Sequence, residues 1–173
     1  VENKGDSIRV SQEAAAAGQR SVKLEDAPGL SAAFNPHLVY KLNHNAGCTR
    51  ASFDLRLERG AHLFYEWRSW DVQPYRIGPS FWIQDGKLTV AGRELVRLPT
   101  GQWIHFDISA PVGADANGKW ELTIGLPDQP PRRFPELATA SPDFKNLTWS
   151  GWCSMATEKT AFYLDNIRVK NEP

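Results

Sequence analysis

Apolar residues recur at every second position in several segments of this chain, and this alternation constrains the fold more than any other feature of the sequence. In ASFDLRLE, residues 51–58, the apolar side chains Phe53, Leu55 and Leu57 alternate with polar ones. A period of two places successive side chains on opposite faces of an extended strand, one toward a core and one toward solvent. We therefore predict a half-buried strand at residues 51–58.

The same pattern occurs in QWIHFDIS and KWELTIG. The predicted inward side chains are Ile104, Phe106 and Ile108 in the first segment and Trp120, Leu122 and Ile124 in the second. Gly- and Pro-rich turns such as 85–87 and 99–102 lie between such segments. The segment SQEAAAAGQ favours a helix by composition but has no apolar stripe, so we expect it to connect two strands. Many short strands joined by turns predict an all-β fold, an antiparallel two-sheet β-sandwich of the jelly-roll type.

Length and charge limit the classes of function. A chain of 173 residues suits a single domain spanning 1–173. Twenty Lys and Arg residues balance twenty Asp and Glu residues, which disfavours nucleic acid and anionic membranes as partners. No apolar run approaches the roughly 18 residues of a membrane-spanning helix. The first residues, VENKGDSIRV, carry neither Met nor a signal pattern, so we expect a domain excised from a larger multidomain or processed protein.

Three segments carry a resemblance to a known fold family. TAFYLDNIRVKN resembles the last strand of laminin G-like and concanavalin A-like jelly rolls and of several carbohydrate-binding module families. IRVSQEAAAAGQRSVKLED is similar to their first hairpin, and GQWIHFDI with GKWELTIGLPDQPPRRF resembles the back half of laminin G-like domains of bacterial polysaccharide-degrading enzymes. The resemblance implies a jelly roll whose two ends lie close together. It also implies a secreted protein, extracellular or periplasmic, with other domains of a parent enzyme as partners.

The resemblance also implies one structural calcium ion. In related modules the Asp of the terminal Asp-Asn pair helps to hold this ion, together with oxygens of the first hairpin. Here that Asp is Asp165, and Glu13 is the candidate partner. Calcium takes six to eight oxygen ligands, including carbonyls that a sequence does not reveal. The alternative, a carboxylate that caps backbone amides, stays open, as does the choice between a Cys48–Cys153 disulfide and two free thiols.

Catalysis is the less favoured interpretation. Glycoside hydrolysis needs two carboxyl groups across the scissile bond, and the Glu-x-Asp-x-x-Glu strand of the retaining glucanases that share this fold is absent. The nearest pair is Glu66 and Asp71. Lyases of this architecture combine Arg, Gln, His and Tyr, and no spacing in the sequence supports such a group. Its candidate members here are Arg56, Gln84, His105 and Tyr65.

A binding site has better support. Residues 64–82, FYEWRSWDVQPYRIGPSFW, contain three Trp, two Tyr and two Arg residues. Sugars stack their C–H faces on Trp and Tyr rings and exchange hydrogen bonds with polar side chains. Trp70 and Tyr75 lie in a Pro-containing loop, where strand burial does not explain a large aromatic residue. The predicted ligand-binding residues are Trp70, Tyr75, Arg76, Arg68, Glu66, Trp67 and Trp152.

Strand parity leaves part of this set open. In HLFYEWRSW, residues 62–70, aromatic side chains fall on both faces, so the inward face is undetermined. A core position is favoured for Trp67, Trp82, Trp103 and Trp120, each of which lies in an alternating strand, although Trp67 stays among the candidate ligand-binding residues. Trp149 and Trp152 are three residues apart and point to opposite sides of a strand, so we expect at most one to be exposed.

We therefore predict a noncatalytic carbohydrate-binding module that binds a polysaccharide or oligosaccharide through exposed aromatic, Arg and polar side chains. One alternative is a catalytic jelly roll, either a glycosidase or a polysaccharide lyase. Another is a structural accessory domain whose aromatic residues pack on a neighbouring domain. Whether the glycan is neutral or anionic stays open.

Overall fold

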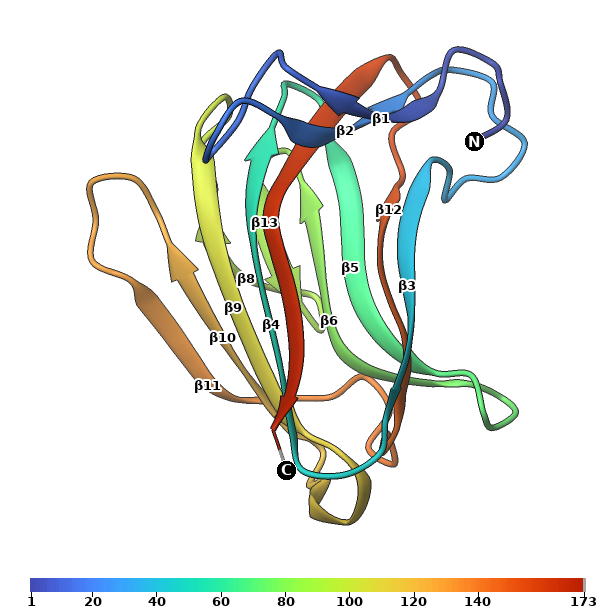
Figure 1. The fold of residues 1–173 in the computed structure, drawn as a ribbon, viewed down its shortest axis with the longest axis vertical. Coiled ribbons are helices and arrows are strands. Elements are labelled where there is room, and N and C mark those ends of the chain that lie inside the picture. The colour runs from blue at the N-terminus through green and yellow to red at the C-terminus, as the bar shows by residue number, and fades with distance from the viewer. Residues whose placement is uncertain (173) are drawn as a thin grey trace.

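The computed structural model describes residues 1–172 as two antiparallel sheets packed face to face (Figure 1). The larger sheet contains seven strands, in spatial order β1 (Ser7–Ser11), β2 (Ser21–Asp26), β13 (Thr160–Glu172), β4 (Cys48–Leu57), β9 (Trp103–Pro111), β10 (Lys119–Gly125) and β11 (Arg132–Ala138). The smaller sheet contains six, in order β3 (His37–His44), β12 (Leu147–Ser154), β5 (His62–Ser69), β6 (Arg76–Gln84), β7 (Lys87–Val90) and β8 (Arg93–Arg97). This arrangement confirms the predicted antiparallel β-sandwich.

The core lies between the two sheets and is built from the alternating residues of each strand. Phe53 of β4 stacks on Phe106 of β9, with 5.1 Å between ring centroids. The Phe53 ring also meets the edge of Trp152 from β12 in the opposite sheet, at 4.9 Å. The predicted inward residues of β9 and β10 are all buried, which confirms those two predictions.

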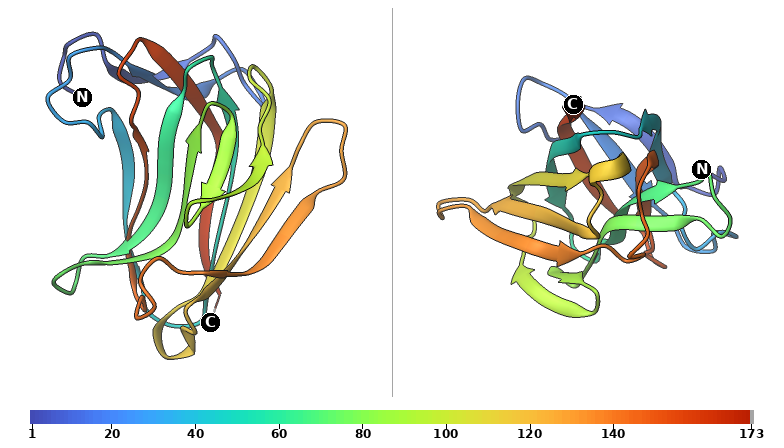
Figure 2. Two further views of the ribbon diagram at one scale, coloured as in Figure 1. Left: turned by 180° about the vertical axis from the view of Figure 1, so that it is seen from behind. Right: turned by 90° about the horizontal axis from the view of Figure 1, so that it is seen from below.

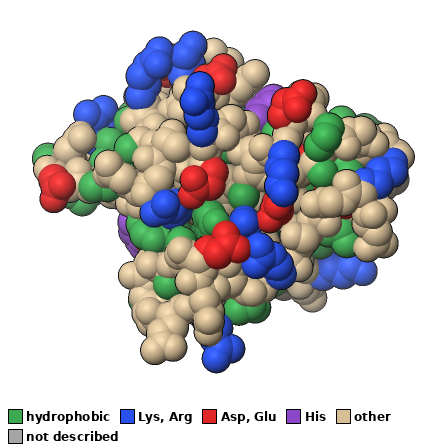
Figure 3. Space-filling view, turned by 90° about the horizontal axis from the view of Figure 1, so that it is seen from above, with side chains coloured by type: hydrophobic (Ala, Val, Ile, Leu, Met, Phe, Trp, Pro, Cys, Tyr) green, Lys and Arg blue, Asp and Glu red, His purple; other side chains and the backbone are tan. Residues whose placement is uncertain are grey.

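The first hairpin and the last strand pair in the larger sheet, although β13 ends at the opposite end of the molecule from the N-terminus (Figure 1). Strand β13 lies between β2 and β4, with Phe162 opposite Leu24 on one side and Leu57 on the other. The Ala-rich segment between β1 and β2 forms a connection rather than a helix, as predicted. Figure 3 looks onto the end that carries the β1–β2 hairpin and shows Lys and Arg side chains beside Asp and Glu. Within residues 1–172 the one helix, η1 (Gly113–Asp115), is too short to cross a membrane.

Two connections extend beyond the packed sheets. The β10–β11 hairpin leans away from the sandwich, as Figures 1 and 2 show. The connection between β5 and β6, residues 70–75, projects from the smaller sheet near its lower end in Figure 1. It is tied to the start of β12 and to the residue before it, because Asn146 Nδ2 donates to Asp71 Oδ2 at 2.7 Å and the Trp70 amide donates to Thr148 Oγ1 of β12 at 2.8 Å. This loop is therefore held beside the outer face of the smaller sheet.

Candidate functional site

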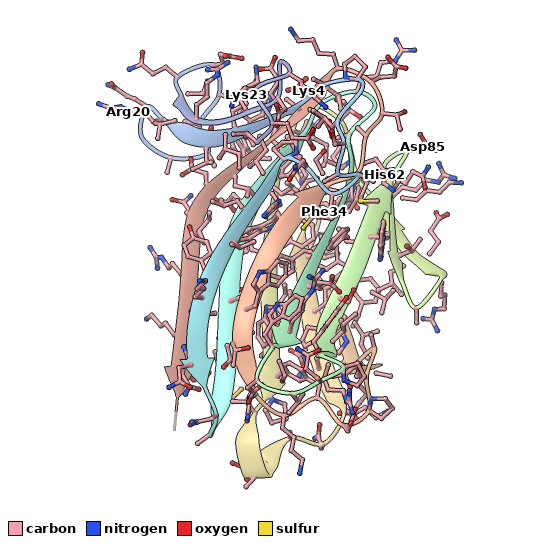
Figure 4. The ribbon with its side chains drawn as sticks, turned by 90° about the vertical axis from the view of Figure 1, so that its right-hand side faces the viewer. Lys4, Arg20, Lys23, Phe34, His62 and Asp85 are labelled. Carbon is pink, nitrogen blue, oxygen red and sulfur yellow. The ribbon has the colours of Figure 1, made fainter. Side chains whose placement is uncertain are left out.

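A hollow of about 480 Å³ lies on the outer face of the six-stranded sheet, the face turned away from the core. Figure 4 looks onto this side of the molecule, with Phe34 and His62 toward its upper end. The wall residues come from β3, β5 and β12 and from the loops at their ends. They are Phe34, His37, Phe64, Arg68, Trp70, Tyr75, Trp149, Cys153 and Met155.

Strand β5 supplies the centre of the hollow and part of the core. Leu63, Tyr65 and Trp67 point inward, so Phe64, Glu66 and Arg68 lie on the outer face. The prediction that Trp67 contacts a ligand is wrong, since its side chain is 0% exposed and its Nε1 donates to the buried Tyr65 hydroxyl at 2.8 Å. The competing core interpretation of Trp67 is the one that the structure confirms.

Trp149 and Trp152 of β12 fall on opposite sides of their strand, as predicted. The prediction that Trp152 is the one that contacts a ligand was wrong. Trp152 stands opposite Tyr65 in the pairing with β5, and it is fully buried. Trp149 stands opposite Arg68 and lines the hollow instead. The register between β12 and β5 therefore places Trp149, not Trp152, on the side of the hollow.

Arg68 lies at the centre of an aromatic cluster. Its guanidinium carbon is 4.2 Å from the Trp149 ring centroid, 5.1 Å from that of Tyr75 and 5.6 Å from that of Trp70. A cation over an aromatic face is attracted by the negative charge density of the ring. The predicted residues Arg68, Trp70 and Tyr75 are thus brought together in one place, although Tyr75 is separated from Arg68 by a loop.

Glu66 is the ion-pair partner of Arg68. Arg68 Nε donates to Glu66 Oε1 at 3.0 Å, and Nη2 donates to the same oxygen. The side chain of Glu66 is only 8% exposed, and that of Arg68 is 15% exposed. Burial raises the pKa of Glu66, and the hydrogen bonds from Arg68 act in the opposite direction. Glu66 therefore holds Arg68 in place rather than lining the hollow itself.

Trp70 and Tyr75 form the exposed wall of the hollow. Their ring centroids are 4.4 Å apart, and 44% of Trp70 and 36% of Tyr75 remain exposed. Arg76, also predicted to bind, begins β6, and its guanidinium is engaged by Asp143 and by the carbonyl of Pro74. Arg76 does not line the hollow, so the structure separates it from the other predicted residues.

Trp82 is an exposed aromatic residue that the sequence interpretation assigned to the core. It lies on β6 opposite Phe64, with 4.8 Å between ring centroids, and 41% of it is exposed. Its neighbours Phe81 and Ile83 are buried. The alternation Phe81, Ile83 was the available signal, because it places Trp82 on the outer face with Phe64.

The upper wall of the hollow depends on the first residues of the chain, which sequence reasoning missed. The Glu2 carboxylate accepts hydrogen bonds from the amides of Ser31 and Ala32 and from Asn35 Nδ2, at 2.7 to 2.9 Å. These hydrogen bonds, of which the one from the Ala32 amide has the largest effect, hold the pKa of Glu2 well below its usual value. The segment that they fix carries Phe34, whose ring packs edge-on against His37.

Asp165 and Glu13 have other partners in the structure. Asp165 Oδ2 accepts from the amides of Ala16 and Ala17 at 2.8 and 3.1 Å, so it caps backbone amides. Hydrogen bonds from Lys23, then Arg9, lower the pKa of Glu13 to about 2. These contacts leave few carboxylate oxygens for a calcium ion. Calcium binding at Asp165 and Glu13 stays a prediction. Among residues 1–172, no group of three His, Cys, Asp or Glu side chains is placed to hold a metal ion.

The catalytic candidates are dispersed. Arg56 and His105 belong to the seven-stranded sheet, whereas Gln84 belongs to the other sheet and Tyr65 is buried between the two. Of the two carboxyl candidates, Asp71 accepts a hydrogen bond from Asn146 and Glu66 pairs with Arg68. Both cysteines are free thiols, and Cys153 lies in the floor of the hollow.

Comparison with known proteins adds evidence on the fold. No protein-family model matches the chain, and no curated protein matches it. Similar solved structures include the cellulose-induced protein Cip1, with a TM-score of 0.65 and 14% identity over 98% of this chain and 88% of that chain. The endo-β-1,4-glucuronan lyase of the fungus Trichoderma reesei is similar with a TM-score of 0.62 and 10% identity, over 99% of this chain and 90% of the lyase chain.

A marine PL-14 alginate lyase from Aplysia kurodai is also similar, with a TM-score of 0.61 and 11% identity over 96% of this chain and 87% of that chain. The chain has the jelly-roll fold of these proteins. At such identities the likeness concerns the fold, so the function has to be argued from the hollow itself.

Proposed function

We propose that this chain is a noncatalytic module that binds a polysaccharide on the outer face of its six-stranded sheet. One observation carries the proposal: Trp70, Tyr75 and Trp149 surround a partly buried Arg68, and the exposed Trp82 lies farther along the same sheet face, beside Phe64. Aromatic rings offer flat apolar surfaces to the C–H faces of sugars, and Arg donates several hydrogen bonds to hydroxyl oxygens. The three fold neighbours named above, whose names refer to cellulose, glucuronan and alginate, support a carbohydrate ligand.

The aromatic surface is long enough to contact more than one sugar unit. Trp82 lies on β6 next to Phe64, and Trp70 lies at the other end of β5, beyond Arg68. Residues 62–69 of β5 span about 25 Å at the usual rise of a strand. A chain of sugars lying along β5 would therefore meet Trp82 at one end and Trp70 at the other.

Electrophoresis in gels that contain soluble polysaccharides tests the proposal. Neutral glucans, mannans and xylans and acidic polyuronates are each cast into a gel, and retardation of the protein reports binding. We expect retardation by at least one polymer, and at least about tenfold weaker binding after Trp70→Ala or Trp82→Ala. Trp103→Ala is the matched control, because Trp103 is partly exposed on the seven-stranded sheet.

The outcomes separate this proposal from its alternatives. Loss of binding in both site variants, with folding and the Trp103→Ala control intact, supports the module. Retardation by no polymer contradicts it and favours an accessory domain whose aromatic surface packs on another domain. A chelator added to the same gels tests the calcium ion predicted at Asp165 and Glu13. Secretion, to the extracellular space or periplasm, is part of the proposal because polysaccharide ligands occur there.

A lyase is the second candidate, because Arg68, His37 and Tyr75 line the same hollow. Arg is suited to bind a uronate carboxylate, and His and Tyr are suited to move protons. Incubation with polyuronates, followed by the ultraviolet absorbance of unsaturated uronate ends, measures this activity. Product formation that is lost in Tyr75→Phe would replace the noncatalytic proposal with a lyase.

A further inference from the structure

The hollow has almost no net charge, although an arginine stands at its centre. Of the side chains that line it, Arg68 is the one that carries a formal charge at neutral pH. His37 is the other basic residue, and burial lowers its pKa, which keeps the imidazole neutral. The carboxylate of Glu66 compensates Arg68 from beneath the surface.

Among residues 1–172, Arg68 is the one cation that pairs with Glu66. Across the sheet it stands between Gly151 of β12 and Ser80 of β6, and neither carries a charge. Burial makes an unpaired carboxylate costly, so Glu66 and Arg68 stay together when the hollow is empty and when it is filled. The pair therefore presents a ligand with hydrogen-bond donors but little net positive charge.

The guanidinium keeps donors for a ligand. Nε and Nη2 point to Glu66 Oε1, and no group within residues 1–172 accepts a hydrogen bond from Nη1. Neutral hydroxyl and ring oxygens accept such hydrogen bonds without bringing a second negative charge near Glu66. A carboxylate would lose its hydration and lie close to Glu66, so attraction to Arg68 would be offset by repulsion.

The charges at the rim do not change this balance. Lys41 of β3 stands opposite Trp149 of β12 and is exposed, so solvent and salt screen its charge. Asp71, on the loop next to Trp70, has the opposite sign and is also exposed. Arg76 is paired with Asp143.

We infer, on the basis of the proposed polysaccharide-binding function, that the hollow selects neutral glycans and that Glu66 is the residue that excludes polyuronates. Glu66 acts through Arg68 rather than by touching the ligand: it holds the guanidinium in position and balances its charge. Removing its charge alone would leave Arg68 free to pair with a ligand carboxylate.

The test compares wild type and Glu66→Gln on one neutral polymer and on alginate and polygalacturonate, at low and high salt. Wild type should bind the neutral polymer more tightly than either polyuronate, with little dependence on salt. Glu66→Gln should raise the affinity for a polyuronate relative to the neutral polymer by about tenfold, and salt should reverse the gain.

Two control variants isolate the cause. Glu121→Gln makes the same change of net charge on the opposite sheet, where Glu121 pairs with Arg133, and should leave the ratio unchanged. Glu66→Asp keeps the charge and should not create polyuronate binding. Circular dichroism and thermal unfolding establish that each variant is folded, and if Glu66→Gln does not fold, the wild-type ranking and its salt dependence decide alone.

The failure of this inference differs from that of the proposed function. Tighter binding of wild type to a polyuronate than to every neutral polymer overturns the inference and leaves the binding module standing. An unchanged ratio in folded Glu66→Gln also overturns it. Binding to no polymer, neutral or acidic, removes the proposed function and the inference with it.

Discussion

The guanidinium of Arg68 lies over the ring of Trp149, 4.2 Å from its centroid, and the same ring lies beside the backbone of Gly151. The two stacked side chains come from neighbouring strands and face each other in register. Arg68 is thus fixed by Trp149 on one side and by Glu66 on the other. This arrangement makes the arginine part of a rigid surface rather than a mobile charge, and a rigid donor loses less entropy when a ligand binds.

Replacing Trp149 should loosen that surface. A cation–π contact contributes about 0.5–2 kcal/mol, and Trp149→Ala removes it together with a stacking surface. We expect polysaccharide binding to weaken by about tenfold, with a smaller loss for Trp149→Phe, which keeps an aromatic ring. Isothermal titration with the retained polymer measures both. Equal binding by Trp149→Ala and wild type would contradict the role of the stacked pair.

Gly151 should tolerate no side chain. A Cβ at this position would lie 2.8 Å from the carbonyl oxygen of Leu38 and 3.0 Å from the edge of the Trp149 ring. Gly151→Ala should therefore lower the free energy of unfolding by about 1–3 kcal/mol and displace the Trp149 ring. Urea unfolding measures the loss. Gly125→Ala, whose Cβ would meet its nearest neighbour at 3.3 Å, is the milder control, and a larger loss there would contradict the argument.

The buried hydroxyl of Tyr65 should matter for stability but not for binding. It accepts hydrogen bonds from Trp67 Nε1 at 2.8 Å and from Ser150 Oγ at 2.9 Å, and burial raises its pKa to about 12. Tyr65→Phe leaves both donors without a partner, at a cost of about 1–3 kcal/mol of unfolding free energy. Chemical unfolding gives this cost, and gel retardation should be unchanged. A loss of binding without a loss of stability would show that Tyr65 takes part in the site.

Asp26 should make stability depend on pH. Burial, and to a smaller extent the charge of Asp6, raises the pKa of Asp26, and no group in the described part of the chain, residues 1–172, forms a hydrogen bond with its Oδ2. The folded state therefore binds the Asp26 proton more tightly than the unfolded state does. This contribution to stability is present at low pH and is lost as pH rises from the ordinary Asp value, about 4, through the folded pKa.

The variant Asp26→Asn isolates this contribution from the other carboxyl groups. Those with lowered pKa values, such as Glu13 and Glu25, act in the opposite direction in wild type and variant alike. The difference in unfolding free energy between Asp26→Asn and wild type should therefore increase from about pH 4 to about pH 8. Urea unfolding at several pH values measures it. A difference that is constant with pH would show that Asp26 does not titrate in this range.

Much of the fold could be predicted from the sequence because it rests on local patterns. Strands β4, β9 and β10 alternate cleanly, so both their existence and their inward faces were predicted. A Pro-containing loop from Trp70 to Arg76 was predicted from its composition, and its aromatic residues Trp70 and Tyr75 do lie at the surface, although Arg76 already begins β6. The position of Arg68 beside them could not be predicted, because it depends on which face of β5 meets the core.

The site was only partly predictable, because both faces of β5 and β12 carry aromatic residues. Trp67 and Trp152 have the same chemical character as Trp149 and Trp82, yet the first two are buried and the last two line the outer face. Within β5 and β12 no local pattern tells the buried Trp67 and Trp152 from the outward Trp149, whereas for Trp82 the flanking Phe81 and Ile83 were a local signal. The sequence by itself determined that this chain forms short strands with apolar alternation and aromatic loops. Only the tertiary structure decided which aromatic side chains a ligand can reach, because burial depends on strand register and on the opposing sheet, which are contacts between residues far apart in the chain.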